Sequence, residues 1–586
     1  MRKTKIVCTI GPATKTKEKI RELMDNGMDA ARINFSHGTY ESHTELIENV
    51  KTVRDELNLP IPLILDTKGP EIRIKEFESK KVYLETGSNF TLTTRDINGS
   101  EKIVAVTYKN LPNDLKKGSR VLLDDGLVEL RVFALTDTDI ECEVINGGFL
   151  SSNKGVNIPD VYVNLPSLTK RDIEDIKFGI EMNFDYVAAS FIRSADDVLK
   201  IRKVLEENGG GDINIIAKIE NREGVNNIAE ILDVSDGIMV ARGDLGVEIP
   251  IEEVPLVQKD LIKRASAVCK PVIIATQMLE SMATNPRPTR AEANDVANAI
   301  FDGSDAIMLS GETASGKYPG ESVAIMAKIA TTTENSINYV KRLRQQFSPE
   351  YTNMTNAISY AACTTAAELH TSCITTVTKS GFTARMISKF RPFCPIAASS
   401  FNERVWRQLN LIWGCKPVLL GEILDNNKVF ELAMDTAVKS GLASNGDTIV
   451  IAIGVPVGVS GSTNTMRVEI IGDVICKGIG IGAKKISGKS SIVKARGEAE
   501  KNFKTGDILV IASINNDMVE VAKRASAIVV GPIEHSDNSH AEILGSALDI
   551  PVVICNTNVT DLIKNGTLIT VDAKKGFVYM GVPKED

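Results

Sequence analysis

Six apolar runs in the first part of the chain end in polar side chains that could bind an anion or a metal. The endings are Arg32-Ile33-Asn34-Phe35-Ser36-His37, Asp66-Thr67-Lys68, Lys218-Ile219-Glu220, Arg242-Gly243-Asp244, Thr276-Gln277 and Ser310-Gly311-Glu312. A single polar residue at a strand end is more often a cap or a turn residue than a catalyst. Six such endings in one chain weaken that interpretation and favour one shared site.

These residue types suit the transfer of a phosphoryl group. Such a transfer asks little covalent chemistry of the protein, because it mainly needs cations that neutralise the moving group and hold it in line. Arg32 and Lys218 provide cations, and Glu220 and Asp244 could hold Mg²⁺ or Mn²⁺ from two neighbouring strands. No GxxxxGK[ST] sequence occurs in this part of the chain, which excludes a P-loop kinase.

A zinc site is disfavoured by the histidines and cysteines. His37 and His43 lack the spacing and the partners of zinc ligands, and we expect a turn or surface role for His43. The nine cysteines are scattered without a CxxC pair. We therefore expect reduced structural thiols rather than a disulfide framework.

Eight strand-like runs alternate with amphipathic helical stretches and would position these side chains. The runs are Lys5–Ile10, Ala30–Phe35, Leu63–Thr67, Tyr186–Phe191, Ile213–Ile219, Gly237–Ala241, Val272–Thr276 and Ala306–Leu309. This alternation indicates parallel βα units. Eight such units close most economically as a (β/α)₈ TIM barrel with its active site at the carboxyl ends of the strands. The predicted fold class is therefore α/β.

Three further segments depart from the barrel pattern. Residues 71–164 contain short strands and turns, and we expect a small inserted β-barrel domain that acts as a lid on the barrel formed by residues 1–70 and 165–345. Residues 346–472 are typical of a three-layer α/β domain. The Gly-rich residues 473–586 are expected to form an extra domain.

Composition sets the broad class of protein. With 586 residues, 43% hydrophobic and 25% charged, the chain is typical of a globular protein with several domains. Its formal net charge of -8 argues against a nucleic-acid-binding surface, which is usually basic. No apolar run is long enough to cross a bilayer, and no signal peptide precedes the first strand. We expect a cytoplasmic protein without a membrane partner.

Sequence blocks around these residues resemble the pyruvate kinase family over roughly the first 470 residues. The blocks are KTKIVCTIGPAT from Lys3, ARINFSHG from Ala31, LDTKGPEIR from Leu65, AKIENREG from Ala217, MVARGDLGVEIP from Met239, ATQMLESM from Ala275 and NPRPTRAEANDVANAIFDGSDAIMLSGETASGKYP from Asn285. The resemblance implies phosphoryl transfer from phosphoenolpyruvate to ADP, giving pyruvate and ATP in glycolysis. It also implies a homotetramer that uses Mg²⁺ or Mn²⁺ and K⁺.

The same resemblance implies roles for the residues of the site. Arg32 would contact the transferring phosphate, Lys218 would stabilise its charge, and Thr276 would lie beside the enolate and help to bind the substrate or relay its proton. Glu220 and Asp244 would bind the divalent metal.

The substrate carboxylate and a monovalent cation would be held beside these groups. Backbone amides at Gly243 and Asp244, at a helix start, would hold the carboxylate. The potassium ligands implied by the resemblance are Asn34, Ser36, Asp66 and Thr67. Family members that need potassium carry Glu at the position of Glu71, so we expect potassium activation.

The nucleotide would be held without a P-loop. The resemblance implies contacts to ADP or ATP from Asn34, His37 and Arg73, and from Lys154 in the inserted domain. A loop lysine such as Lys154 would otherwise be read as an exposed surface residue. The insert would close over the substrates and exclude water.

A loop in the third domain resembles the site at which relatives bind a phosphorylated allosteric effector. Its candidate residues are Thr378, Lys379, Ser380, Gly381 and Thr383, and hydroxyls, amides and a lysine before a helix suit a phosphate. An Arg of relatives that respond to fructose bisphosphate is replaced by Phe382, so the effector stays open. A simple helix cap is the alternative.

The tail resembles the swivelling phosphohistidine domain of phosphoenolpyruvate-utilising enzymes. The matching sequences are SHAEIL from Ser539 and IPVV from Ile550. These domains usually carry GGxTSHAAI around the phosphorylated histidine, and Asp537-Asn538 replaces part of that sequence here. We expect a stabilising or regulatory appendage in which His540 is not a catalyst.

Two other functions fit part of the pattern. A Mg²⁺-dependent aldolase or lyase that stabilises pyruvate enolate would use the same two carboxylates, but it has no use for Arg73, Lys154 or the lid. A catalytically silent scaffold that binds sugar phosphates would not need the intact set of Lys218, Glu220 and Asp244.

Overall fold

The computed structural model describes residues 1–159, 161, 163–346, 353–421, 428–455, 463–493, 503–514, 516–531 and 539–582. The chain divides into two compact units. The first comprises Met1–Thr364, Thr376–Asn426 and Ile453–Thr465, and the second comprises Thr365–Thr375, Asn427–Ala452 and Met466–Asp586. The finer division into five segments stays a prediction.

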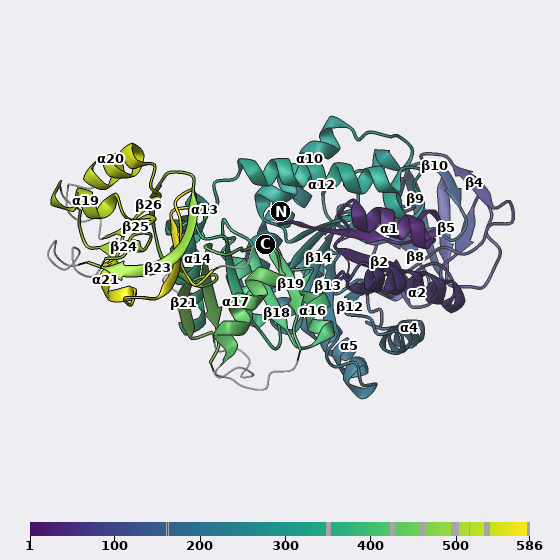
Figure 1. Ribbon diagram of the computed structural model, residues 1–586. Helices are drawn as coiled ribbons and strands as arrows, with labels where there is room; N and C mark the ends of the chain where they lie inside the picture. The colour runs from purple at the N-terminus through teal and green to yellow at the C-terminus, as the bar shows by residue number, and fades with distance from the viewer. Residues whose placement is uncertain are drawn as a thin grey trace. The chain divides into compact units, whose positions relative to one another are not determined.

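The eight predicted strands form a closed parallel barrel (Figure 1). Around the barrel they are β1 (Lys5–Thr9), β16 (Ala306–Leu309), β15 (Val272–Ala275), β14 (Gly237–Ala241), β13 (Asn214–Ile219), β12 (Tyr186–Ala189), β3 (Leu63–Asp66) and β2 (Ala30–Asn34). Their register places Asn34 opposite Asp66, and Lys218 opposite Met239. The TIM-barrel prediction is confirmed, and the carboxyl ends of all eight strands meet at one face.

Helices surround this barrel because each strand is apolar on both faces. The longer ones are α1 (Lys17–Asp25), α2 (Tyr40–Glu56), α4 (Lys170–Glu181), α5 (Ala195–Glu207), α7 (Ile228–Val234), α9 (Val254–Ala267), α10 (Arg290–Asp302) and α12 (Pro319–Ser336). One set of strand residues, such as Leu65 and Ile219, packs against the helices. The alternate set, such as Ile216 and Met239, fills the barrel interior. Two cores therefore hold the strand ends in place.

The insert after β3 is a β domain, as predicted. Its strands are β4 (Lys81–Leu84), β5 (Asn89–Thr93), β6 (Ile103–Ala105), β7 (Arg120–Leu123), β8 (Val128–Leu135), β9 (Asp139–Asn146), β10 (Gly148–Ser151) and β11 (Val156–Asn157), with the short helix α3 (Leu111–Asp114). They pair as a two-stranded sheet, β10-β4, and a six-stranded sheet, β11-β7-β8-β9-β5-β6. Isolated bridges such as Ile74 to Val106 join further segments. Among the described residues, strand pairing does not close the expected small barrel.

An α/β segment follows the last barrel helices. Its strands are β17 (Cys373–Val377), β18 (Ile396–Ser400), β19 (Cys415–Leu419), β20 (Thr448–Ile453) and β21 (Thr465–Ile470), and its helices include α14 (Met354–Glu368), α15 (Phe382–Lys389), α16 (Glu403–Leu409) and α17 (Val429–Lys439). Strand β18 pairs in parallel with β19, and β17 with β20. Strands and helices alternate along this segment, as the predicted α/β class requires.

The tail forms a second, smaller closed barrel. Its strand order is β22 (Val474–Ile481), β26 (Val552–Cys555), β25 (Ala527–Val530), β24 (Ile508–Ile511), β23 (Lys485–Ile492), β27 (Leu568–Asp572) and β28 (Phe577–Met580). Helix α20 (Ser539–Leu548) packs beside β22 and β26. The strands of the tail thus close into a barrel with apolar residues packed inside it and under its helices.

One expectation about the cysteines is wrong. Cys476 on β22 and Cys555 on β26 form a disulfide, while the other seven cysteines take part in no disulfide. The two bonded residues lie 79 positions apart in the sequence, so their spacing carries no sign of the pair. Pairing of β22 with β26 in the tail barrel brings them together.

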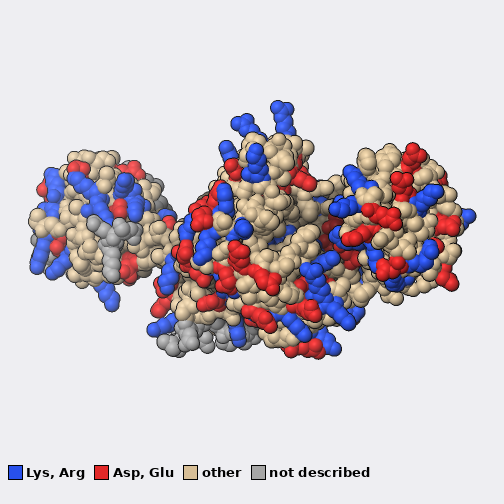
Figure 2. Space-filling model, turned by 90° about the vertical axis from the view of Figure 1, so that its right-hand side faces the viewer, with Lys and Arg blue, Asp and Glu red and all other residues tan. Residues whose placement is uncertain are grey.

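Charged side chains of both signs are spread over the surface. On the face drawn in Figure 2, Lys and Arg side chains are interleaved with Asp and Glu. No helix among the described residues is long and apolar enough to cross a membrane.

A buried ionic network ties the amino ends of the barrel strands to α16. Asp185, which precedes β12 and is fully buried, pairs with Arg407 at 2.8 Å and lies 3.9 Å from Arg54. It also accepts the backbone N–H of Leu63 at 2.9 Å. Burial raises the pKa of Asp185, while the two arginines lower it. The carboxylate therefore depends on partners from three parts of the first unit.

We expect Asp185→Ala to reduce the free energy of unfolding of the barrel by about 3–5 kcal/mol, because two buried guanidinium groups lose their buried counter-ion and keep only longer contacts to the exposed Asp55 and Glu403. The matched control is Asp196→Ala, which removes an exposed carboxylate paired with Lys200 and should cost less than about 1 kcal/mol. Urea unfolding followed by circular dichroism measures both changes. Equal stability of the two variants would contradict the importance of this network.

Candidate active site at the barrel mouth

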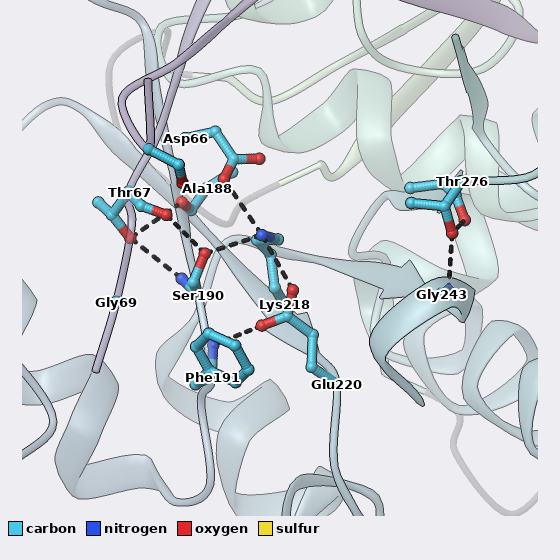
Figure 3. Close-up of polar contacts among 12 residues, drawn as sticks. Asp66, Thr67, Gly69, Ala188, Ser190, Phe191, Lys218, Glu220, Gly243 and Thr276 are labelled. Carbon is cyan, nitrogen blue, oxygen red and sulfur yellow. Dashed lines mark hydrogen bonds and ion pairs between the residues drawn. The ribbon is translucent and has the colours of Figure 1, made fainter. Parts of the chain in front are cut away.

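The ammonium group of Lys218 lies at the centre of the polar groups at the barrel mouth (Figure 3). Its Nζ is 2.9 Å from Glu220 Oε1 and 3.1 Å from Asp66 Oδ1, and it donates to Ser190 Oγ at 2.8 Å. The side chain is only 12% exposed. Burial opposes its charge, but Asp66 and Glu220 outweigh burial and raise the pKa of Lys218. Lys218 is therefore a fixed cation at neutral pH.

Glu220 and Asp244 face each other's charge in this buried site. Burial raises the pKa of Glu220 to about 7; Lys218 lowers it and Asp244 raises it further. Burial also raises the pKa of Asp244, with added repulsion from Asp125 and Glu71. The second oxygen of Glu220 accepts the backbone N–H of Phe191 at 2.6 Å. Two crowded carboxylates with only oxygen donors fit a hard divalent cation, whose charge would relieve their repulsion.

Arg32 is positioned from two other strand ends. Its Nε donates to Asp66 Oδ2 at 2.7 Å, and its Nη1 donates to Thr9 Oγ1 at 2.9 Å. Asp66 thus bridges Arg32 and Lys218 with its two oxygens. Although burial acts to raise the pKa of Asp66, these two cations lower it below its usual value. The Asp66 carboxylate holds Arg32 and Lys218 side by side, and two adjacent cations suit the binding of a phosphate.

Thr276 has a strained backbone at the end of β15. The φ of Thr276 is 68°, and that of Gln277 is 53°. A positive φ is rare for a β-branched residue such as Thr276 and costs about 1–3 kcal/mol. Thr276 Oγ1 accepts the backbone N–H of Gly243 at 2.8 Å, and Arg242 Nη2 donates to the Thr276 carbonyl at 2.7 Å. Figure 3 shows this pair apart from the Lys218 cluster. The strain presents the hydroxyl of Thr276 to the first turn of α8 (Arg242–Glu248).

The predicted potassium ligands lie together at the ends of β2 and β3. Asn34 is opposite Asp66 in the register, and Asn34 Oδ1 accepts the backbone N–H of Ser36 at 3.1 Å. Thr67 Oγ1 accepts the N–H of Ser190 at 3.1 Å. The set therefore consists of oxygen atoms on adjacent segments, which is the donor type that a monovalent cation prefers.

Two of the predicted nucleotide contacts lie in the insert. Arg73 donates to Glu71 at 2.8 Å and to the Asn153 carbonyl at 2.7 Å, and Lys154 pairs with Asp124 at 2.8 Å. The Lys154 carbonyl accepts the N–H of Ile74, the residue after Arg73. The backbone pairing of the insert thus sets the segments that carry Arg73 and Lys154 side by side.

The two histidines differ in environment. His37 is exposed beyond β2. The turn or surface role expected for His43 is wrong, because this residue lies within α2, is buried and stacks on Phe35 with ring centroids 4.3 Å apart. Burial lowers its pKa, so it packs as a neutral aromatic ring. Its position on the apolar face of α2 was the signal for burial.

The insert is anchored where it leaves and re-enters the barrel, and a cleft of about 370 Å³ lies beside these anchors. Gly69 has φ 70°, and its N–H donates to Asp172 at 3.0 Å. Arg193 donates to the carbonyls of Val163 and Leu165 at 2.9 and 2.8 Å. Between the anchors, Asn157 of the insert donates to Glu248 at the end of α8 at 2.9 Å. The insert therefore touches the helix that carries Asp244.

Ser190 and Thr9 were not among the predicted site residues. Each lies at or just after the carboxyl end of its strand, β12 and β1, so the rule that identified the other six strand ends would also have identified these two. Ser190 Oγ donates to the Thr67 carbonyl at 2.6 Å while it accepts from Lys218. The hydroxyl thus connects the cation to β3.

The predicted effector loop precedes α15. Thr378 is buried, Lys379 is exposed, and the buried hydroxyl of Thr383 lies 2.9 Å from that of Thr463. Ser380 and Gly381 line a separate pocket, in which Gly381 adopts a left-handed φ of 75°. Ser380 and Gly381 therefore face a different part of the structure from Thr383, which contacts Thr463.

Comparisons with known proteins decide the family. Residues 1–323 match the barrel domain of pyruvate kinase, residues 356–469 match its alpha/beta domain, and residues 503–576 match the mobile domain of PEP-utilising enzymes. This chain belongs to the pyruvate kinase family. The pyruvate kinases of Geobacillus stearothermophilus and Bacillus licheniformis are each 48% identical to it, and each alignment covers 99% of both chains. The pyruvate kinase of Staphylococcus aureus is 44% identical over the same share.

Membership of this family makes the chain an enzyme of the phosphotransferase class. The full-length coverage includes the tail, so the extra domain is shared with these pyruvate kinases. His540 lies in the first turn of α20 and is partly exposed. Asp537 and Asn538, which precede it, lie outside the described residues.

In this pyruvate kinase family member we expect Ser190→Ala to lower kcat by roughly 10- to 100-fold, because a hydrogen bond to a charged group contributes about 1.5–3 kcal/mol. Ser194→Ala is the matched control, since the Ser194 side chain makes no capping hydrogen bond. Steady-state kinetics of both variants measure the effect. An unchanged kcat for Ser190→Ala would show that Lys218 is positioned by its carboxylates alone.

Proposed function

We propose that this enzyme transfers the phosphoryl group of phosphoenolpyruvate to ADP at the carboxyl face of the first barrel. The observation that carries the proposal is the convergence of Lys218 with Asp66, Glu220 and Ser190, next to Arg32. Cations are brought to one place in a buried site, where they stabilise developing charge more strongly than in water.

Arg32 and Lys218 act on the moving phosphoryl group. Arg32 binds its oxygens, and Asp66 and Thr9 hold the guanidinium in place. Lys218 neutralises charge while the group passes to ADP. Because the pKa of Lys218 is raised, it acts as a permanent cation rather than as a proton donor.

Glu220 and Asp244 are the residues that would hold Mg²⁺ or Mn²⁺. When bound, the ion would polarise substrate oxygens and offset the charge of the two carboxylates. Beside them, the amides of Gly243 and Asp244 would receive the substrate carboxylate. Thr276, whose hydroxyl accepts from the Gly243 N–H, would bind the substrate or relay a proton to the enolate.

The insert acts as the lid of this site. Arg73 and Lys154 would contact the nucleotide phosphates, and Asn34 and His37 would contribute from the barrel. The hydrogen bond from Asn157 to Glu248 supports a closed position of the lid over α8. Closure would exclude water that could otherwise hydrolyse the phosphoryl donor.

Regulation and assembly complete the proposal. We retain a homotetramer and a phosphorylated effector at Thr378, Lys379, Ser380, Gly381 and Thr383 as predictions. The identity to pyruvate kinases along the whole chain weighs against both the enolate lyase and the silent scaffold. An assay coupled to lactate dehydrogenase with and without ADP separates the three, since only a kinase needs ADP to form pyruvate.

We predict that Lys218→Met lowers kcat by on the order of 10²–10³-fold, which is the usual cost of removing one electrostatic contact to a transition state. Lys203→Met is the control, because that side chain is 74% exposed on α5. The coupled assay measures pyruvate formation for both. Full turnover of Lys218→Met would refute the assignment of Lys218.

A second prediction concerns potassium. We expect K⁺ to raise the initial rate about tenfold or more in buffer without other monovalent metal ions, because the missing cation corresponds to at least about 1.4 kcal/mol of transition-state stabilisation. Glu71→Lys should lose most of this dependence, since the new ammonium group supplies a positive charge. Glu76→Lys, at an exposed position of the insert, should respond to K⁺ like the parent enzyme. Equal rates with and without K⁺ in the parent enzyme would contradict the prediction.

A further inference from the structure

Helix α4 contacts both segments that carry the predicted potassium ligands. One segment continues from β2 and carries Asn34 and Ser36, and the other continues from β3 and carries Asp66 and Thr67. The helix spans Lys170–Glu181 and follows the return of the chain from the insert. Its contacts to the two segments therefore affect how far apart the predicted ligands lie.

The segment after β2 is held by α4 through a backbone contact and a ring contact. Arg171 Nη2 donates to the carbonyl of Phe35 at 3.2 Å, and the ring of Phe35 packs on Phe178 with centroids 5.9 Å apart. Phe35 stands between Asn34 and Ser36 in the chain and is buried. Its position therefore sets the positions of two predicted ligands.

The far end of the same segment is attached to α4 by Tyr40, the first residue of α2. The ring of Tyr40 stacks on Phe178 with centroids 4.7 Å apart, and its hydroxyl donates to Asp175 Oδ1 at 2.7 Å. Asp175 is buried. Burial and the hydrogen bond to Asp175 raise the pKa of Tyr40 to about 12, so the hydroxyl remains a donor at neutral pH. The segment from Phe35 to Tyr40 is thus fixed to one helix at both ends.

The segment after β3 is attached to the first turn of α4. The N–H of Gly69, two residues after Thr67, donates to Asp172 Oδ1 at 3.0 Å. Asp172 is fully buried, and its other oxygen accepts the N–H of Thr169 at 2.9 Å, which caps the helix. One carboxylate therefore joins the start of α4 to the segment that carries Asp66 and Thr67.

The helix is a rigid support for these contacts because it lies directly on the barrel. Gly179 has no side chain, and a Cβ atom there would lie 2.5 Å from the side chain of Leu65 on β3. Ile176 is fully buried in the apolar layer under the helices. Since α4 cannot shift without disturbing β3, the two segments that carry the ligands are held at a fixed separation.

We propose that α4, through Arg171 and the Tyr40–Asp175 hydrogen bond, fixes the spacing of the predicted ligands and so makes the site prefer K⁺ to the smaller Na⁺. A cage of oxygen atoms that cannot contract contacts the larger ion with all of its ligands, but it reaches the smaller ion with only some of them. Arg171, Tyr40 and Asp175 are positioning residues, because they act on the cation through the segments that they hold. The inference rests on the potassium part of the proposed function.

Binding is tested without turnover, by thermal unfolding of the full chain while K⁺ or Na⁺ replaces tetramethylammonium at constant ionic strength. An ion that binds the folded state raises the unfolding temperature by mass action, and the concentration dependence gives its apparent affinity. Tyr40→Phe and Arg171→Met should each lower the ratio of K⁺ to Na⁺ affinity roughly three- to tenfold, which is part of what a hydrogen bond to a charged group contributes.

Two matched controls remove similar groups at exposed positions. Tyr83→Phe removes the hydroxyl of an exposed tyrosine in the insert, and Lys177→Met removes an exposed charge from α4 itself. Both should keep the parent ratio. Asp175→Asn should also keep it, because the amide oxygen still accepts the hydroxyl of Tyr40. A ratio that is unchanged in Tyr40→Phe and Arg171→Met, or that changes equally in the two controls, would overturn the inference.

Initial rates at saturating substrates give a second measurement. The half-saturating K⁺ concentration should rise in Tyr40→Phe, that of Na⁺ should stay the same or fall, and saturating K⁺ should restore the parent rate. A general loss of stability would instead lower the rate in both salts and leave the ratio of the two concentrations unchanged, which would contradict the positioning role alone. A parent enzyme that responds to neither ion in either assay would contradict the potassium prediction and this inference with it.

Discussion

The ammonium group of Lys218 contacts side chains from the ends of three barrel strands. The positions of the polar side chains at the barrel mouth depend on these contacts. Asp66 brings the cation next to Arg32, Glu220 brings it next to the predicted metal site, and Ser190 links it to β3. Each of these partners would be costly to bury alone. Because carboxylates partner Lys218 and Arg32, both cations can stay charged in a buried site, which is what charge stabilisation in phosphoryl transfer requires.

Closure of the barrel makes this cluster possible. The parallel register sets Asn34 against Asp66, and side chains from β2, β3, β12 and β13 therefore reach one rim. Two apolar layers, one inside the barrel and one under the helices, fix the strands from both sides. The local strain at Thr276 and at Phe191, whose φ is 56°, is tolerated because this packing overdetermines the backbone.

The amino ends of the strands carry a second set of buried charges with a different purpose. Asp185 with Arg407 and Asp305 with Arg391 connect the barrel to the α/β segment of the same unit. Both carboxylates are buried, and each is paired with an arginine of that segment.

The sequence alone determined the eight barrel strands, the insert and most of the site, because apolar runs followed by polar residues report both strand position and strand ends. It also contained Ser190 and Thr9 at such ends, although they were overlooked. Only the tertiary structure decided that Asp66 bridges two cations, that His43 is buried, that Asp185 meets Arg407, and that Cys476 reaches Cys555. Those are contacts between residues far apart in the chain, and their geometry follows from strand register and helix packing, which local sequence patterns do not encode.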